Sequence, residues 1–320
     1  MQLKTTITTL ITFLLNLPGL TAQGYDFTVA QDGTGDFTTV QDAVNAVPDF
    51  RKKTTTIFIK KGTYKEKLVL PASKVLVTFI GESRDETVLT YDDYAAKKNR
   101  FGEEIGTTGS TSFFIFGEGF TARNLTFENS AGPVGQAVAA RIDGDQAAFY
   151  NCRFLGFQDT LYPHGAQSRQ YYKNCYIEGT VDFIFGWSTA VFEDCEIFCK
   201  KGGYVTAAST EKDGGFGFVF LNCRITGDAP EQSFYLGRPW RPYAKTAFIR
   251  CFLDKLIKPE GWHNWSKPDA EQTTFYAEYE NDGPGAETGK RVGWAHQLTA
   301  EEAAGYTVEH ILRGWKPAVE

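Results

Sequence analysis

Asn151-Cys152-Arg153-Phe154 recurs 23 residues later in the chain as Asn174-Cys175-Tyr176-Ile177. Related segments lie on both sides of this pair: Arg123-Asn124-Leu125-Thr126-Phe127, Glu193-Asp194-Cys195-Glu196-Ile197, Leu221-Asn222-Cys223-Arg224-Ile225 and Ile249-Arg250-Cys251-Phe252-Leu253. The segments between them are short runs of β-branched and aromatic residues that lack a helical pattern. Repeats of this length without helices predict a parallel β-helix, in which each coil stacks on the preceding one.

The rest of the chain fits one all-β domain over residues 25–320. Residues 38–47 carry apolar side chains at helical spacing and stop at Pro48, which predicts a short amphipathic helix that caps the first coil. Near the other end, Thr299-Ala300-Glu301-Glu302 is a capping box, and residues 308–312 suggest a further helical turn. We expect these C-terminal turns to pack on the outside or on the end of the solenoid.

Residues 1–24 resemble a secretory signal peptide, with one lysine, a short apolar run and small residues near the end. An apolar N-terminal strand is the alternative. A cleaved signal predicts a protein that is secreted or periplasmic. The formal net charge of −6 predicts no general attraction to nucleic acid or to an anionic membrane, and no second apolar run reaches membrane-spanning length.

Five of the six cysteines occupy the same place in successive repeats. This pattern predicts a ladder of buried thiols along the solenoid. A disulfide between Cys175 and Cys195 is the alternative, because adjacent strands lie at a distance that a disulfide tolerates. Cys199 lies outside the ladder and has no predicted partner.

Two apolar segments, residues 157–161 and 181–186, each carry a single carboxylate, Asp159 and Asp182. Each aspartate follows the cysteine of its repeat by seven residues, so stacked cysteines imply stacked aspartates about 4.8 Å apart. Two close carboxylates do not ionise independently, and we expect a raised pKa for one and a low pKa for the other. The alternative is that both are turn aspartates bonded to backbone N–H groups.

Three further polar residues suggest chemistry around this pair. Gln158 precedes Asp159, and Gln136 lies one coil earlier, so both amides could stabilise a developing oxyanion. Arg238 could hold one aspartate ionised through a bidentate contact. Considered without the neighbouring motifs, Gln136 could equally be an ordinary surface glutamine, and Arg238 could be an ordinary exposed arginine.

Six short segments occur in the order expected of one known family. They are Gly33-Thr34-Gly35-Asp36-Phe37, Gly62-Thr63-Tyr64-Lys65-Glu66, Gln136-Ala137-Val138-Ala139, Gln158-Asp159-Thr160-Leu161, Asp182-Phe183-Ile184-Phe185-Gly186 and Leu236-Gly237-Arg238-Pro239-Trp240. Together they resemble the pectin methylesterases (pectinesterases) and cover nearly the whole of residues 25–320. The resemblance implies a right-handed parallel β-helix that hydrolyses the C6 methyl esters of galacturonate units in pectin and releases methanol.

The resemblance also implies a role for each site residue. Asp182 matches the nucleophile, Asp159 the general acid and base, Gln158 and Gln136 the oxyanion donors, and Arg238 the residue that orients Asp182 and keeps it charged. With these roles, we expect Asp182 to be the carboxyl with the low pKa and Asp159 to be the protonated acid. The residues that it implies for substrate binding are Trp240, Tyr162, Val181, Phe185, Thr107 and Trp262. Thr107 matches only approximately, because the loop around it differs in length. Ala140 stands where many members carry leucine, and we expect that change to affect packing only.

No cofactor is implied, and no cluster of His, Cys, Asp and Glu has the spacing of metal ligands. The expected partner is methyl-esterified homogalacturonan, and the expected state is a monomer. A β-helix glycosidase or lyase acting on pectin is the rival enzyme, since a carboxylate pair about 5 Å apart also suits a retaining glycosidase. A non-catalytic carbohydrate-binding solenoid is the remaining alternative, although it has no use for paired aspartates.

Overall fold

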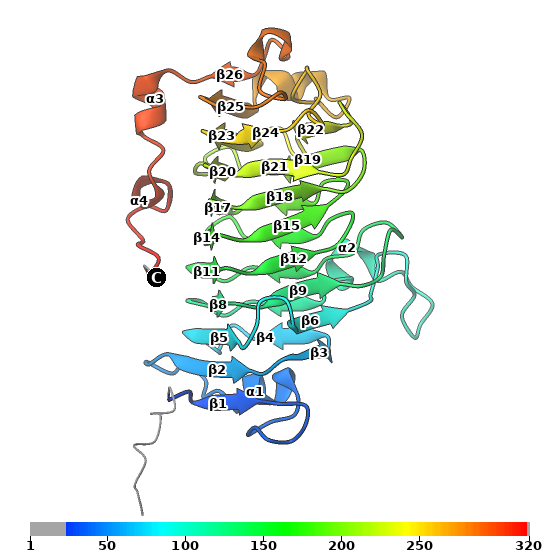
Figure 1. The fold of residues 1–320 in the computed structure, drawn as a ribbon, viewed down its shortest axis with the longest axis vertical. Helices are drawn as coiled ribbons and strands as arrows, with labels where there is room; N and C mark the ends of the chain where they lie inside the picture. The colour runs from blue at the N-terminus through cyan, green and yellow to red at the C-terminus, as the bar shows by residue number, and fades with distance from the viewer. Residues whose placement is uncertain (1–23, 319–320) are drawn as a thin grey trace, which may run out of the picture.

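The computed structural model describes residues 24–318 as a stack of coils built from three parallel sheets (Figure 1). The predicted signal peptide therefore lies almost entirely outside the described residues. Successive strands of one coil belong to different sheets, and each strand pairs with its equivalent on the next coil, as in β11, β14 and β17. The predicted all-β parallel solenoid is confirmed.

The sheets are named by their order along a coil. Sheet 1 contains β1 (Phe27–Val29), β2 (Thr55–Ile59), β5 (Val77–Gly81), β8 (Thr121–Arg123), β11 (Ala147–Tyr150), β14 (Arg169–Lys173), β17 (Thr189–Glu193), β20 (Phe218–Leu221), β23 (Lys245–Ile249), β25 (Phe275–Tyr279) and β26 (His296–Gln297). Sheet 2 contains β3 (Gly62–Lys65), β6 (Thr87–Tyr91), β9 (Thr126–Asn129), β12 (Arg153–Leu155), β15 (Tyr176–Gly179), β18 (Glu196–Cys199), β21 (Arg224–Gly227) and β24 (Phe252–Leu253). Sheet 3 contains β4 (Leu68–Leu70), β7 (Phe113–Ile115), β10 (Ala140–Ile142), β13 (Leu161–Pro163), β16 (Ile184–Gly186), β19 (Gly203–Ala208) and β22 (Phe234–Gly237).

The residue before each of the five ladder cysteines forms the corner between sheet 1 and sheet 2. These residues have a positive φ, for example 48° at Asn151, 53° at Asn174 and 52° at Asp194. Asn and Asp adopt this left-handed conformation more readily than other L-residues. The repeated segments in the sequence thus mark a corner of the backbone that recurs in successive coils. The cysteine that follows each corner points into the core.

The cysteine side chains form the predicted buried ladder, and all six are free thiols. Cys175 and Cys195 are each 1% exposed, and the Cys175 N–H donates to the Cys195 Sγ at 3.4 Å. The structure therefore contains no disulfide between them. Beside this ladder, aromatic rings stack from coil to coil, with centroids 4.7 Å apart for Tyr172 and Phe192 and 4.6 Å for Phe192 and Phe220.

Short helices lie at the N-terminal end of the solenoid and along the outer side of sheet 1 (Figure 1). The predicted capping helix is observed as α1 (Val40–Ala46), which begins later than expected because Thr39 is its N-cap. The capping box of α3 (Ala300–Ala304) and the turn α4 (Val308–Ile311) are confirmed. Both helices pack on sheet 1, where Ile311 and Leu312 are fully buried. The remaining helical segments are α2 (Gly106–Gly109), η1 (Pro268–Gln272) and η2 (Thr288–Lys290).

None of the helices in residues 24–318 has both the length and the apolar character needed to cross a membrane.

Candidate active site

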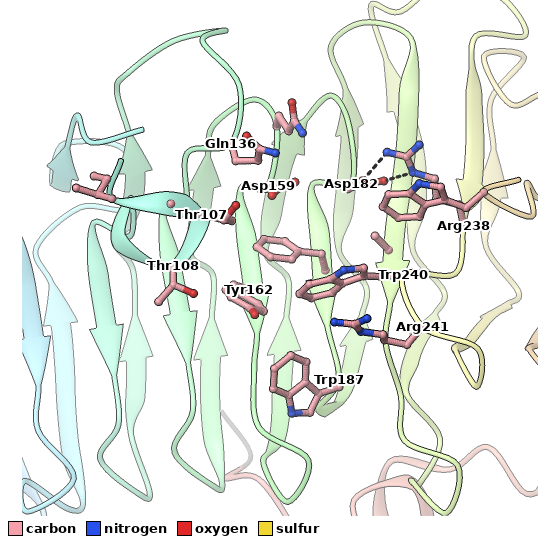
Figure 2. Close-up of a pocket in the computed structure, with 16 residues that line it drawn as sticks. Thr107, Thr108, Gln136, Asp159, Tyr162, Asp182, Trp187, Arg238, Trp240 and Arg241 are labelled. Atoms are coloured by element: carbon pink, nitrogen blue, oxygen red, sulfur yellow. Dashed lines mark hydrogen bonds and ion pairs between the residues drawn. The ribbon is translucent and has the colours of Figure 1, made fainter. Parts of the chain in front are cut away.

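A cavity of about 730 Å³ lies across the outer face of sheet 3 (Figure 2). Residues 105–108, which include most of α2, form one wall. The loop after β22 forms the opposite wall. The lining residues are Ile105, Gly106, Thr107, Thr108, Gln136, Gln158, Asp159, Tyr162, Asp182, Phe185, Trp187, Ala207, Arg238, Trp240, Arg241 and Trp265.

Asp159 and Asp182 lie on adjacent coils in the predicted register. The Asp159 N–H donates to the Val181 carbonyl at 3.1 Å, and two residues later Leu161 pairs with Ile184. Both aspartates have a positive φ, 62° for Asp159 and 52° for Asp182. This conformation, at the bend that leads into sheet 3, suits aspartate better than most residues. The residues between Asp159 and Asp182 in the sequence therefore make up one coil of the solenoid.

Arg238 is held rigidly against Asp182. Its Nε donates to Asp182 Oδ1 at 2.8 Å, and its Nη2 donates to Oδ2 at 2.7 Å (Figure 2). The guanidinium also lies 3.9 Å from the centre of the Tyr204 ring and 3.6 Å from that of Trp265. A planar guanidinium with a bidentate partner and two rings packed against it has little freedom to reorient. This arrangement fixes the direction of the Asp182 carboxylate.

The two carboxyls differ in environment. Burial raises the pKa of Asp159 well above its usual value, and the negative charge of Asp182 adds to this effect. Burial also raises the pKa of Asp182, but the hydrogen bonds and charge of Arg238 oppose the increase. The prediction of a low pKa for Asp182 is therefore wrong in sign, because burial outweighs the arginine. The expected difference between the two carboxyls is retained, because the pKa of Asp159 is raised well above its usual value and Arg238 opposes the increase at Asp182. Asp159 is therefore the better candidate for the neutral acid.

Replacing Arg238 is expected to shift the pH dependence of the reaction. Arg238→Gln removes the charge that favours ionised Asp182, so the pKa of Asp182 should rise and the acidic limb of the kcat/KM profile should move to higher pH. Loss of orientation should lower kcat/KM near neutral pH by about 10²-fold. The matched control is Arg241→Gln, which also alters a cavity arginine but does not touch Asp182. If the acidic limb of Arg238→Gln lies at the same pH as in wild type, Arg238 does not favour the ionised form of the nucleophile Asp182.

Asp159 is expected to reduce the stability of the folded state near neutral pH. The pKa of Asp159 is higher in the folded protein than in the unfolded chain, where it is about 3.8. The contribution of Asp159 to the free energy of unfolding is therefore complete below about pH 3.8 and is lost as pH rises through the pKa of the folded protein. Asp159→Asn should therefore raise Tm at pH 7, with a smaller gain at pH 3.5. Asp194→Asn is the control, since Asp194 also has a positive φ but pairs with Lys173 at the surface. Equal Tm values for wild type and Asp159→Asn at pH 7 would contradict the expected destabilisation by Asp159.

Gln136 and Gln158 lie side by side on adjacent coils and line the cavity. Their backbones form a parallel bridge, and the Ala137 N–H donates to the Gln158 carbonyl at 3.1 Å. Within residues 24–318, neither carboxamide hydrogen-bonds to a protein group. Both amides are therefore available to a bound molecule.

Aromatic side chains form the floor of the cavity beside the polar group (Figure 2). Tyr162 and Phe185 stack with their ring centroids 4.0 Å apart, and Trp240 lies 5.9 Å from Phe185. Burial raises the pKa of Tyr162 to about 12, which keeps its hydroxyl neutral. Thr107, the approximate match, lines the cavity from α2. Rings beside polar groups suit the faces and hydroxyls of a sugar chain.

Two of the expected substrate-binding residues do not line the cavity. Trp262 is only 1% exposed, stacks on Tyr276 with centroids 4.3 Å apart, and donates to Glu278 Oε1 at 3.1 Å. Its assignment to the substrate was wrong, because its ring fills the core. Val181 is partly buried and outside the cavity, and its backbone carbonyl accepts the hydrogen bond from Asp159.

Several lining residues were not predicted from the sequence. They are Ile105, Gly106, Thr108, Trp187, Ala207, Arg241 and Trp265. Trp187 follows the 181–186 segment directly and could have been predicted from that position. Trp265 could not, because it reaches Arg238 from a loop that carries no repeat. In residues 24–318, no group of three or more His, Cys, Asp or Glu side chains is placed to hold a metal ion.

The fold and the site together define a class of protein. It is a parallel β-helix hydrolase in which paired aspartates, an arginine and two glutamines meet on one face of the solenoid.

The comparison with known proteins identifies the family. The family model for pectinesterase matches residues 26–315. Pectinesterase 31 of Arabidopsis thaliana is 44% identical over 288 residues, which cover 88% of this chain and 90% of that protein. The chain therefore belongs to the pectinesterase family and is a carboxylic ester hydrolase.

Solved structures agree with this assignment. The pectin methylesterase from carrot is 37% identical with a TM-score of 0.83, and the match covers 92% of this chain and 94% of that one. A pectin methylesterase solved in complex with a hexasaccharide is 30% identical with a TM-score of 0.82, covering 93% and 100% of the two chains. Other relatives, described as pectinesterase/pectinesterase inhibitor, are longer, and the chain spans 58% and 49% of two of them.

Proposed function

We propose that this chain removes methyl groups from pectin by hydrolysing the C6 methyl esters of its galacturonate units, with Asp182 as nucleophile. The arrangement that supports this proposal best is the bidentate pairing of Arg238 with Asp182 beside the more strongly protonated Asp159. Arg238 thereby orients Asp182 and favours its charged form, while burial and the charge of Asp182 favour the protonated form of Asp159. That division is what an ester hydrolase needs for attack and for departure of the alcohol.

The first step forms a covalent intermediate. An oxygen of ionised Asp182 attacks the ester carbonyl carbon, and the carbonyl electron pair moves to oxygen. The amides of Gln136 and Gln158 donate to this oxyanion. When the carbonyl re-forms, the bond to the methoxy oxygen breaks, and Asp159 gives its proton to that oxygen. Methanol leaves, and the galacturonoyl group remains on Asp182 as a mixed anhydride.

The second step restores the enzyme. Ionised Asp159 removes a proton from a water molecule, and the water oxygen attacks the galacturonoyl carbon. The oxyanion again lies against the two amides. Its collapse breaks the bond to Asp182, which leaves as a carboxylate beside Arg238. The products are a galacturonic acid unit, which loses its proton to solvent and becomes galacturonate, and the starting enzyme, with Asp159 protonated again.

The glutamines and Arg238 favour ester hydrolysis over cleavage of the glycosidic bond. A retaining glycosidase also uses two carboxylates, but it stabilises a developing positive charge on the sugar ring. Two amide donors beside the nucleophile match a developing negative charge instead.

Three products measured in one reaction test the proposed function. Highly methylated pectin is incubated with the purified protein, and methanol, reducing ends and the absorbance of unsaturated products are followed together. We expect methanol to appear without a rise in the other two. New reducing ends without methanol would support a glycosidase, unsaturated products would support a lyase, and binding without any product would support a carbohydrate-binding solenoid.

We also propose that the protein is exported and acts as a monomer. A polymeric cell-wall substrate requires an enzyme outside the cytoplasm, which fits the signal-like residues 1–24. The two aspartates, the two glutamines and Arg238 all line one cavity of the same chain, so the proposed steps use no residue of a second copy.

A further inference from the structure

Asn129 lies behind the wall of the cavity and does not line it. It is the last residue of β9, and it is 3% exposed. Its Nδ2 lies 2.9 Å from the Asp93 carbonyl, 3.1 Å from the Ser110 carbonyl and 3.2 Å from the Val138 carbonyl. Its Oδ1 accepts a hydrogen bond from the Ala131 N–H at 3.0 Å. One buried carboxamide thus connects three segments that are distant in the sequence.

Two of these segments are the ends of a single excursion of the chain. Asp93 precedes residues 94–109, which leave the solenoid as a hairpin and return through α2. Ser110 closes that excursion. Among residues 24–318, no other protein group donates to either of the carbonyls of Asp93 and Ser110. Asn129 therefore satisfies two buried acceptors and holds the two ends of the excursion together.

The third segment carries Gln136. After Asn129, residues 130–135 lack regular structure, and Gly132 and Gly135 have φ of 82° and 103°. Gln136 then forms its bridge with Gln158, and β10 begins at Ala140, two residues after Val138, whose carbonyl contacts Asn129. The Gln136 carbonyl accepts a hydrogen bond from the Ala95 N–H of the excursion at 2.9 Å. The backbone of Gln136 is therefore held by Ala95, two residues after Asp93, and is followed two residues later by Val138. Asn129 bonds to the carbonyls of both Asp93 and Val138.

We propose that Asn129 is a positioning residue for the reaction, which holds the backbone of Gln136 so that its amide faces the developing oxyanion. This inference rests on the proposed function, in which Gln136 is an oxyanion donor. Asn129 itself is buried and does not line the cavity. Its contribution is the rigidity of the junction between the excursion 94–109 and the segment 130–138, because an irregular loop with two glycines does not fix a side chain alone.

A loss of positioning should be visible mainly in kcat. Asn129→Ala leaves the carbonyls of Asp93 and Ser110 without a donor and frees Gln136 to move. We expect kcat to fall by about tenfold, because a displacement of less than 1 Å already weakens an oxyanion contact. KM should change by less than about threefold, since the aromatic floor that binds the sugar is untouched.

A double-mutant cycle distinguishes positioning from a general loss of structure. In the Gln136→Ala background, Asn129→Ala should lower kcat by less than about twofold, because the group that it positions is already gone. In the Gln158→Ala background, Asn129→Ala should retain its tenfold effect, since the bonds of Asn129 go to Asp93, Ser110, Val138 and Ala131 and not to the coil that carries Gln158. The same tenfold loss in the Gln136→Ala background overturns the inference.

Two further variants keep the test decisive. Ser110→Ala removes the hydroxyl that accepts from the Val138 N–H at 3.2 Å, so it loosens the same junction with a smaller change. If Asn129→Ala does not fold, Ser110→Ala should show the same dependence on Gln136, and an equal effect in both backgrounds overturns the inference. Thr90→Val is the control, because it removes a nearby buried hydroxyl bonded to Ser130 but none of the bonds made by Asn129.

The cycle also separates this inference from the proposed function. If Gln136→Ala alone leaves kcat unchanged, the assignment of Gln136 as an oxyanion donor fails, and the role of Asn129 fails with it. If Gln136→Ala lowers kcat by about 10²-fold but the Asn129 effect is independent of it, only the inference about Asn129 fails.

Discussion

Asp182→Asn should lower the rate of methanol release from methylated pectin by about 10⁴-fold or more, because an amide cannot replace the attacking carboxylate. Asparagine is the informative replacement, since it keeps the size of the side chain and tolerates the φ of 52° at this position. It also leaves an oxygen for Arg238 to bond. The solenoid should remain folded, and circular dichroism together with Tm checks this.

Asp194→Asn provides the matched control for this loss. Asp194 has the same φ of 52° and undergoes the same chemical change, but it pairs with Lys173 outside the cavity. Its methanol release should stay within about twofold of wild type, as expected for a surface substitution. Substantial activity in Asp182→Asn, beyond what spontaneous deamidation to aspartate explains, would remove Asp182 from the role of nucleophile.

Asp159→Asn should lower kcat by about 10³-fold, within the range of general acid and base catalysis. The departing methoxy oxygen then receives no proton from the protein, and water is no longer activated in the second step. The raised pKa of Asp159 also makes a prediction about pH. Wild-type activity should fall as pH rises through the pKa of Asp159, and this alkaline limb should be missing from the profile of the variant.

The pH profile distinguishes the role of Asp159 from a merely structural one. A residue that only shapes the cavity would lower the rate at every pH and leave the alkaline limb in place. Retention of that limb in Asp159→Asn would therefore assign the limb, and the acid, to another group. Alongside this loss of activity, the expected gain in Tm would show that the buried carboxyl is maintained at a cost in stability.

The repeat and the carboxylate pair could be predicted because both depend on register. A cysteine and an aspartate seven residues apart in two successive coils must stack together if the coils stack at all. The predicted pairing of Arg238 with one aspartate also matches the observed contact with Asp182, although the spacing alone could not select between the two aspartates. Local patterns likewise predicted the terminal helices, whose caps lie within a few residues of the helix.

Features that depend on three-dimensional burial could not be predicted in the same way. Trp262 was expected at the substrate, but its ring stacks in the core on Tyr276. The sign of the pKa shift of Asp182 depends on whether burial or Arg238 dominates, and the sequence contains no measure of burial. The second ring against Arg238, Trp265, comes from an irregular loop. The bonds of Asn129 join three segments without any repeat, so no spacing indicated them.

A crystal structure of the Asp182→Asn variant with a bound methyl-esterified oligogalacturonate tests the central claim most directly. We predict that the C6 carbonyl carbon lies about 3–3.5 Å from the side chain at position 182, which is the distance of a near-attack arrangement. Its carbonyl oxygen should face the amides of Gln136 and Gln158, and the methoxy oxygen should face Asp159. An ester placed against Asp159 instead, or a carbonyl oxygen turned away from both amides, would contradict the account.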